Sequence, residues 1–544
     1  MAIKFGNGGD NKLTGTNGID LLVGCRGDDT LEGKGGIDFL FGGRGEDVIY
    51  GGDDTDFLLG GKGNDVLYGG EGDDYLNGGR GHDEAFYEGA SDDFTITYKF
   101  NKDGRVVGFR KVEDNEAGID GDEGTDYLRS IEELNFGDGV TISLEGIQLI
   151  RANGDFGGFF DTLKAAVDAS AAGDTIYMGE NTFDSGGAQI VVNHNLTIIG
   201  EGQDESIVLA DDNTGISGNS QGWILVNNGA TLDVEGVAFD GNGFAVSQAF
   251  RVLGSGSFDD VSFNDIKVGS TDGTAIAVGG PTSNVDVSNG TFTNIGLNGI
   301  LYFGSGVTGT VEDSEFVGDG AAETDRETGI EIGGGANVTI NGNEFSDFVG
   351  SGTDVKSAGV YVTTTNGGGS SATVMDNEFE NNTTGIQLGD EADDTSDLTV
   401  QSDNEFLGTG QALDVNGDAT ASGISDSTID GEVEWTGGAA DNTITGGSDN
   451  DSLTGNEGAD ILTGNGGADT FFFAAGDGGG TVAEADTITD FTDGVDMIGL
   501  IGLNDTDLTI TDVGLDAVIS VTIGGEILAV VTGAAGDIDA SDFA

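Results

Sequence analysis

The chain has 544 residues, and 98 acidic residues against 19 basic ones give it a formal net charge of −79. So negative a chain repels nucleic acid, which excludes a nucleic-acid partner, and it opposes its own compact state unless cations are bound. Cys25 is the single cysteine, so no internal disulfide can form, and no uninterrupted apolar stretch is long enough to span a bilayer. The composition therefore predicts no membrane span and a fold held by bound metal.

The N-terminal stretch repeats every nine residues, in nine blocks that start at Gly6 and end with the block at Gly78. The clearest block is Gly42-Gly43-Arg44-Gly45-Glu46-Asp47-Val48-Ile49-Tyr50. The eighth position is aliphatic, as in Leu40, Ile49 and Leu58, which predicts a glycine turn followed by a short strand with one inward residue. The sixth position is Asn11 in the first block and aspartate in the others: Asp20, Asp29, Asp38, Asp47, Asp56, Asp65, Asp74 and Asp83.

Glycine permits the positive-φ turn, and an in-phase carboxylate supplies the hard oxygen that calcium prefers. With this repeat pattern the stretch resembles the RTX (repeats-in-toxin) family. The resemblance implies a parallel β-roll that binds several Ca²⁺ ions through these aspartates. A glycine-rich solenoid with solvated acids and no metal is the alternative. Asp54 replaces the fourth-position glycine of its block, so we expect the weakest turn and the least ordered ion there.

Residues 87–149 lose the nine-residue period and alternate, as in Phe94-Thr95-Ile96-Thr97-Tyr98, which predicts strands. The segment resembles the small β unit that commonly follows RTX rolls. The next domain, 150–436, opens with apolar residues at helical spacing from Phe160 to Ala171, and then strand-like segments at Gly173–Tyr177 and Leu196–Ile199. This order resembles the capped start of a right-handed parallel β-helix of the pectin-lyase-like type.

A longer repeat follows, in which similar segments end at Phe239, Phe263, Phe292, Phe316, Phe345, Phe379 and Phe406. Their spacings of 24, 29, 24, 29, 34 and 27 residues suit one three-strand coil each, with loops of variable length. Such a stripe of Phe is expected to stack inside the solenoid as core.

The nine-residue repeat pattern returns in the last domain, 437–544, with blocks that start at Gly446, Gly455 and Gly464. Their sixth positions add three predicted metal ligands: Asp451, Asp460 and Asp469. The predicted fold is thus all-β, a right-handed parallel β-helix flanked by N- and C-terminal calcium-binding parallel β-rolls. The acidic tail Ala535–Ala544 resembles the C-terminal signal by which RTX-like proteins leave the cell unfolded through type I secretion, without a cleaved N-terminal signal.

No catalytic set emerges from the sequence, so no catalytic residue and no organic cofactor are predicted. Pectate-lyase-like enzymes need an Arg or Lys base beside acidic calcium ligands, and Arg251, Lys267 and Arg326 are the candidates within the β-helix. Alginate C-5 epimerases also combine a β-helix with RTX modules, but the Asp-Pro-His element that they use is missing, because the only proline is Pro281. Fold analogy alone does not supply an activity.

Two functional hypotheses remain. The first is a secreted calcium-binding structural protein of the cell surface or extracellular matrix, a surface-layer or filament subunit that self-associates through calcium and contacts cell-surface polysaccharide or lipopolysaccharide. The second is a secreted polysaccharide lyase or epimerase acting on acidic glycans.

Overall fold

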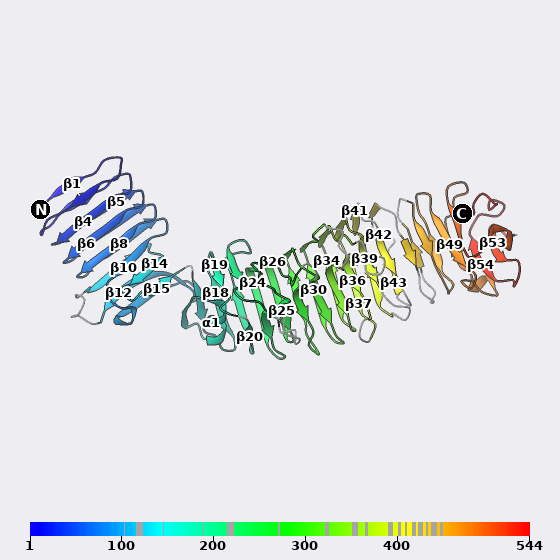
Figure 1. Ribbon diagram of the computed structural model, residues 1–544, viewed down its shortest axis with the longest axis horizontal. Helices are drawn as coiled ribbons and strands as arrows, with labels where there is room; N and C mark the ends of the chain where they lie inside the picture. The colour runs from blue at the N-terminus through cyan, green and yellow to red at the C-terminus, as the bar shows by residue number, and fades with distance from the viewer. Residues whose placement is uncertain are drawn as a thin grey trace. The chain divides into compact units, whose positions relative to one another are not determined.

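The computed structural model describes residues 1–102, 104–115, 123–144, 146–187, 189–214, 222–269, 272–320, 326–350, 357–364, 368–389, 395–400, 404–407, 411–415, 420–422, 428–430, 434–436, 443–446 and 450–544. The chain divides into two compact units, Met1–Asn181 and Thr182–Ala544. Both are built mainly of parallel strands, as the sequence predicts (Figure 1). The helix α1 (Leu163–Ala169) has seven residues, and no helix in the described ranges is long and apolar enough to cross a membrane.

The N-terminal roll consists of two parallel sheets, and successive blocks supply strands to them alternately. One sheet contains β1 (Ile3–Phe5), β3 (Leu21–Val23), β5 (Phe39–Arg44), β7 (Phe57–Lys62) and β9 (Tyr75–Arg80). The other contains β2 (Lys12–Thr14), β4 (Thr30–Gly35), β6 (Val48–Asp53), β8 (Val66–Glu71) and β10 (Glu84–Tyr87). One coil therefore spans two blocks, and the eighth-position residues, among them Leu40, Ile49 and Leu67, are fully buried between the sheets.

Both sheets continue beyond the repeats. The antiparallel hairpin β11 (Phe94–Phe100) and β12 (Val106–Asp114) leads to β13 (Thr125–Arg129), which pairs in parallel with β9. Next, β14 (Glu133–Phe136) pairs in parallel with β10, and β15 (Thr141–Ser143) closes that sheet. The rings of Phe39, Phe57, Tyr75 and Tyr127 stack along the outside with centroids 4.9–5.2 Å apart, so the row of the repeats runs on into β13.

The end of the first unit contains the predicted helix. The antiparallel strands β16 (Ile147–Ile150), β17 (Phe156–Phe160) and β18 (Asp174–Met178) surround α1 in the sequence. Thr162 caps α1 by accepting a 3.2 Å hydrogen bond from the Ala165 amide, while Leu163, Ala166 and Val167 form its buried side. Phe160, expected in the helix, ends β17 instead, and the capping role of α1 stays a prediction.

The second unit begins within β19 (Asn181–Asp184) and forms a solenoid with three strands per coil, for example β30 (Asn298–Phe303), β31 (Thr308–Glu312) and β32 (Glu315–Val317). The strands of successive coils form columns, and within a column each strand pairs in parallel with the corresponding strand of the next coil. The first column is β20 (Ile190–Val192), β23 (Ile224–Val226), β25 (Gln248–Val252), β27 (Thr274–Val278), β30, β33 (Thr328–Gly333), β36 (Ala358–Val362), β39 (Thr384–Leu388) and β42 (Gln411–Val415). The other columns begin with β21 (Leu196–Ile199), β22 (Ser206–Leu209) and the long strands β24 (Thr231–Asp240) and β26 (Ser255–Asn264). They continue as β28 (Val285–Ser288), β31, β34 (Asn337–Asn341), β37 (Ser371–Met375), β40 (Asp397–Val400) and β43 (Thr420–Ser422), and as β29 (Thr291–Thr293), β32, β35 (Glu344–Ser346), β38 (Glu378–Glu380), β41 (Glu405–Leu407) and β44 (Thr428–Asp430).

The predicted phenylalanine stripe is confirmed as core. Rings in successive coils from Phe239 to Phe406 stack with centroids 4.5–5.6 Å apart and nearly parallel planes. Beside the stripe, the buried side chains of Asn343, Asn377 and Asn404 form a ladder. Their Oδ1 atoms accept the backbone amides of Ser314, Asn343 and Asn377, respectively. The stacked rings and the ladder fix the register between coils.

The C-terminal strands return to the two-sheet pattern. One sheet holds β45 (Glu434–Thr436), β47 (Ser452–Thr454), β49 (Thr470–Ala474) and β51 (Met497–Ile501). The other holds β46 (Thr443–Thr445), β48 (Ile461–Thr463), β50 (Asp486–Ile488), β54 (Ile527–Val531), β53 (Asp516–Val521) and β52 (Leu508–Val513).

Candidate metal centre

The sixth-position aspartates form two ladders on opposite turns of the N-terminal roll. In each ladder the Oδ1 atom accepts the backbone amide of the aspartate one coil earlier, as in Asp38 N to Asp56 Oδ1 at 2.7 Å and Asp47 N to Asp65 Oδ1 at 2.8 Å. Asp20, Asp38, Asp56 and Asp74 make up one ladder. Asp29, Asp47, Asp65 and Asp83 make up the other, which starts at Asn11.

The second carboxylate oxygen has no hydrogen-bond partner in most of these residues. The Oδ2 atoms of Asp29, Asp38, Asp47, Asp56, Asp65, Asp74 and Asp83 are buried and unpaired. A buried anionic oxygen without a donor is strongly unfavourable, so each of these atoms calls for a cation.

The turn glycines leave room for that cation. A side chain on Gly24 would collide with Asp29 Oδ2 and would lie 2.7 Å from the carbonyl oxygen of Gly42, one coil on. Gly51 is similar, with Asp56 Oδ2 at 2.7 Å from the position of its missing Cβ and the carbonyl oxygen of Gly69 also in collision. Carboxylate and carbonyl oxygens thus converge where only glycine fits. This is the all-oxygen donor set of a calcium site, and the residues fit the ion that the repeat implies.

Positive backbone φ angles explain the glycines at the second and fourth positions. Gly43 and Gly45 have φ of 123° and 124°, and the same values recur along the roll. Asp54 adopts φ of 74°, a left-handed conformation that is unfavourable for a residue with a Cβ, but Cys25 and Lys34 have φ of 88° and 90°. That the turn of Asp54 is the weakest therefore stays a prediction. How well an ion is ordered there stays a prediction.

The electrostatics of the ladders oppose folding without metal. Burial, with the neighbouring carboxylates adding to it, raises the pKa of Asp56 and Asp74 to about 8 and that of Asp65 to about 7. The same causes raise the pKa of Asp38 and Asp47 to about 6. At neutral pH the buried surroundings therefore disfavour the ionised form of these carboxylates. A bound divalent cation would neutralise their charge and favour the ionised form.

The three C-terminal aspartates have the same surroundings. Asp451 N donates to Asp469 Oδ1 at 2.9 Å, and Asp451, Asp460 and Asp469 are all buried. A side chain on Gly446 would collide with Asp451 Oδ2 and lie 2.8 Å from the Gly464 carbonyl oxygen. All eleven predicted aspartates are buried in glycine turns. Asp20 differs from the others, because its Oδ2 accepts hydrogen bonds from Thr16 and these bonds help to lower its pKa.

Sequence reasoning missed the residues that continue the ladders past the repeats. Asp126 and Glu132 accept the amides of Asp74 and Asp83 at 2.9 Å, and Asp486 and Asp496 accept those of Asp460 and Asp469 at 2.9 and 3.0 Å. One signal was available. Gly124-Thr125-Asp126-Tyr127-Leu128 has the spacing of Gly72-Asp73-Asp74-Tyr75-Leu76.

The candidate bases of the β-helix lie on different coils. Lys267 Nζ is 3.0 Å from Asp265 Oδ1 and donates to Asn294 Oδ1 at 2.7 Å. Arg326 pairs with Glu331 Oε2 at 2.6 Å, and its guanidinium lies 4.5 Å from the centre of the Tyr361 ring. Arg251 stands on β25, where burial lowers its pKa.

Comparison with known families assigns both architectures. The model of the RTX calcium-binding nonapeptide repeat, in four copies, matches residues 5–40, 26–58 and 50–85. The model of the right-handed β-helix region matches residues 274–467, which extends into the first C-terminal blocks. A search of curated proteins found no match. The chain therefore combines N-terminal RTX repeats with a right-handed β-helix, and the RTX repeats imply calcium binding and a secreted protein.

Proposed function

We propose that this protein is a calcium-dependent structural component of the cell surface or extracellular matrix, exported by a type I route and assembled outside the cell. The observation that carries the proposal is the pair of aspartate ladders, in which every aspartate except Asp20 has a buried Oδ2 atom without a partner. Where calcium is scarce these carboxylates keep the roll unfolded and the chain competent for export. Outside the cell, calcium fills the turns and folds the roll.

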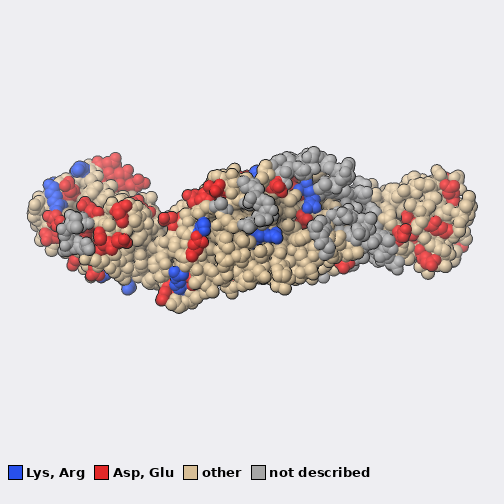
Figure 2. All heavy atoms as spheres, turned by 60° about the horizontal axis from the view of Figure 1, so that its bottom comes forward, with Lys and Arg blue, Asp and Glu red and all other residues tan. Residues whose placement is uncertain are grey.

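Assembly follows from the remaining charge. The formal charge of −79 is much larger than the charge of the ladder aspartates, so calcium bound in the rolls leaves most of it in place. Asp and Glu gather on the face of the first unit drawn in Figure 2. Copies of such a chain repel one another at low ionic strength, and divalent cations can bridge their acidic faces. We infer that self-association, as a surface layer or filament, requires calcium beyond that needed to fold the rolls. The same cations would link the protein to acidic cell-surface polysaccharide or lipopolysaccharide.

Electron microscopy and light scattering on the purified chain test this proposal. We expect ordered assemblies at millimolar calcium and dispersed chains with chelator. Folded monomers that stay dispersed at millimolar calcium would refute the structural role while leaving the calcium-binding rolls intact.

One observation favours the alternative, a polysaccharide lyase or epimerase. Arg326, Glu331 and Tyr361 bring a base, an acid and an aromatic ring together on neighbouring coils of the β-helix. Incubation with alginate and pectate in calcium, with Arg326→Ala and Arg251→Ala as variants, separates the two hypotheses. Turnover that either variant abolishes would replace the structural proposal with an enzymatic one.

A further inference from the structure

We propose that Asp74, the last repeat aspartate of its ladder, and Asp126, which lies outside the nonapeptide repeats, form a calcium site that fastens the β11–β13 extension to the end of the N-terminal roll. The repeat matched by the RTX model ends at residue 85, so Asp126 belongs to none of its copies. The inference does not depend on the assembly function proposed above.

The first step of the argument is the position of Asp126. The strand pairing aligns Tyr127 with Tyr75 and Leu128 with Leu76, which sets Asp126 one coil beyond Asp74. Its Oδ1 accepts the Asp74 amide at 2.9 Å, as each ladder aspartate does for the one before it. Asp126 is therefore the next rung of the ladder, supplied by a segment that returns to the roll after a hairpin.

The second step is the unpaired oxygen. Asp126 is 1% exposed, and its Oδ2 atom is buried with no hydrogen-bond partner, as is the Tyr87 hydroxyl. The Tyr87 hydroxyl is near enough to act against the burial that raises the pKa of Asp126. The position of a Cβ on Gly69 would lie 2.5 Å from Asp74 Oδ2 and 3.1 Å from Asp126 Oδ2. Two buried carboxylate oxygens thus converge at a glycine, where unneutralised they would repel each other.

The third step compares this turn with those of the repeats. At Gly51, the oxygen contributed by the next coil is the Gly69 carbonyl, whereas at Gly69 it is the Asp126 carboxylate. Two buried carboxylates therefore supply oxygens beside Gly69, and anionic oxygen ligands favour calcium. No cluster of three or more acidic, His or Cys side chains with metal-binding geometry occurs in the described ranges, so backbone or water oxygens would complete the coordination.

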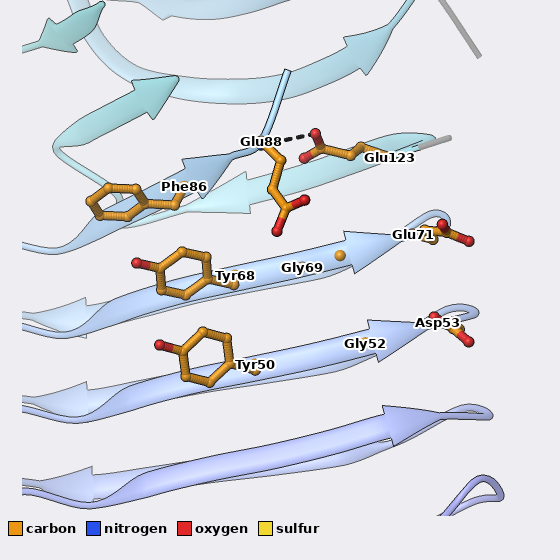
Figure 3. Close-up of a pocket in the computed structure, with 10 residues that line it drawn as sticks. Tyr50, Gly52, Asp53, Tyr68, Gly69, Glu71, Phe86, Glu88 and Glu123 are labelled. Carbon is orange, nitrogen blue, oxygen red and sulfur yellow. Dashed lines mark hydrogen bonds between the residues drawn. The ribbon is translucent and has the colours of Figure 1, made fainter. Parts of the chain in front are cut away.

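A cavity borders the end of β8 that carries Gly69, although neither Asp74 nor Asp126 lines it. Its volume is about 340 Å³, and Gly69 lies in its wall between the rings of Tyr50 and Tyr68 and the acids Glu71, Glu88 and Glu123. Figure 3 shows Glu88 and Glu123 beyond the strand that carries Gly69 and Glu71, with Glu123 accepting the Glu88 amide at 2.9 Å. This acidic wall raises the local concentration of cations beside Gly69.

The same arrangement recurs independently in the C-terminal roll. A side chain on Gly455 would collide with Asp460 Oδ2 and lie 3.0 Å from Asp486 Oδ2. Asp486 also lies outside the nine-residue blocks, and its Oδ1 accepts the Asp460 amide. Both rolls therefore end on a pair of carboxylates whose outer member comes from the flanking segment.

The test uses the full-length chain and the variant Asp126→Asn, which keeps the Oδ1 acceptor for the Asp74 amide and removes the charge. Asp92→Asn is the matched control, because Asp92 is an exposed acid in the same extension. Native mass spectrometry at saturating calcium counts bound ions. We expect one ion fewer in Asp126→Asn than in the control, and two fewer in the double variant Asp126→Asn/Asp486→Asn.

Hydrogen exchange supplies the second readout. In calcium, the amides of β12 and β13 should lose protection in Asp126→Asn while those of β5 and β7 keep theirs. An unchanged ion count with unchanged protection of β12 and β13 would overturn the proposal. If Asp126→Asn instead unfolds the whole roll, Asp486→Asn alone decides, and an unchanged ion count in that variant rejects the site.

Discussion

Replacing Asp65 by Asn should stabilise the N-terminal roll when calcium is absent and destabilise it when calcium is present. Asp65 Oδ1 accepts the Asp47 amide at 2.8 Å, whereas its Oδ2 is buried and unpaired. Asn keeps the acceptor and replaces the anionic oxygen by a neutral amide. Asn11 occupies the equivalent position in the first block, so the turn accepts this side chain.

The expected size follows from the environment of the carboxyl group. Burial raises the pKa of Asp65 from 3.8 to about 7. At about 1.4 kcal/mol per pKa unit, ionised Asp65 destabilises the metal-free roll at pH 8 by up to about 4 kcal/mol. Water and neighbouring charges reduce this figure, so we expect Asp65→Asn to stabilise the metal-free roll by about 1–4 kcal/mol.

With calcium the sign changes, because the variant lacks one anionic ligand. At a calcium concentration of about 100 times the dissociation constant, one site stabilises the folded state by about 2.7 kcal/mol, and the variant should lose much of this. In chelator, where the wild-type roll is unfolded, the stabilising effect of the variant is measured as a gain of β signal in far-ultraviolet circular dichroism at pH 8. In calcium, hydrogen exchange of the β7 and β9 amides reports the local opening free energy. Asp92→Asn, an exposed acid beyond the repeats of the same unit, is the control and should change the opening free energy by no more than about 0.5 kcal/mol. A variant less stable than wild type in both conditions would refute the reasoning.

Three further predictions follow from other parts of the chain. In chelator, acidification from pH 8 to pH 5 should increase amide protection of the roll. The folded-state pKa of Asp56 and Asp74 is about 8 against an ordinary 3.8, so their penalty is absent below pH 3.8 and complete above pH 8; protection that falls on acidification would contradict this. Phe345→Ala should lower the unfolding free energy of the β-helix by about 3–5 kcal/mol in urea titrations, because the ring is fully buried between two stacked rings; a loss below about 1 kcal/mol would mean that the stripe is not core. Asn377→Ala should cost about 1–3 kcal/mol in the same assay by leaving the Asn343 amide without its acceptor, and an unchanged midpoint would exclude the ladder as a support.

The repeated parts of the fold were predictable because a fixed period defines both the turn and the strand pairing. Nine-residue spacing sets Asp47 and Asp65 one coil apart, and the phenylalanine spacing sets Phe316 beside Phe345 without knowledge of the loops between them. The periods that specify these positions are local, and only a stacked solenoid satisfies them repeatedly.

The ends of the rolls were not predictable in the same way. Asp126 lies 52 residues from Asp74, and the hairpin between them breaks the period. The local motif around Asp126 matches that around Asp74, but strand pairing and burial decide which coil it joins, and the period does not give this across the insertion. For Phe160 the local pattern was present but misleading. Its spacing predicted a helix, whereas it pairs with Ile147 of the adjacent strand and ends β17.

Calcium titration of the full-length chain, followed by far-ultraviolet circular dichroism at pH 8, tests most directly whether calcium completes the fold. Starting from chelator, the account predicts a cooperative gain of β signal together with new protection of the amides from β4 to β9. A spectrum and protection pattern that are the same in chelator and in millimolar calcium would contradict it.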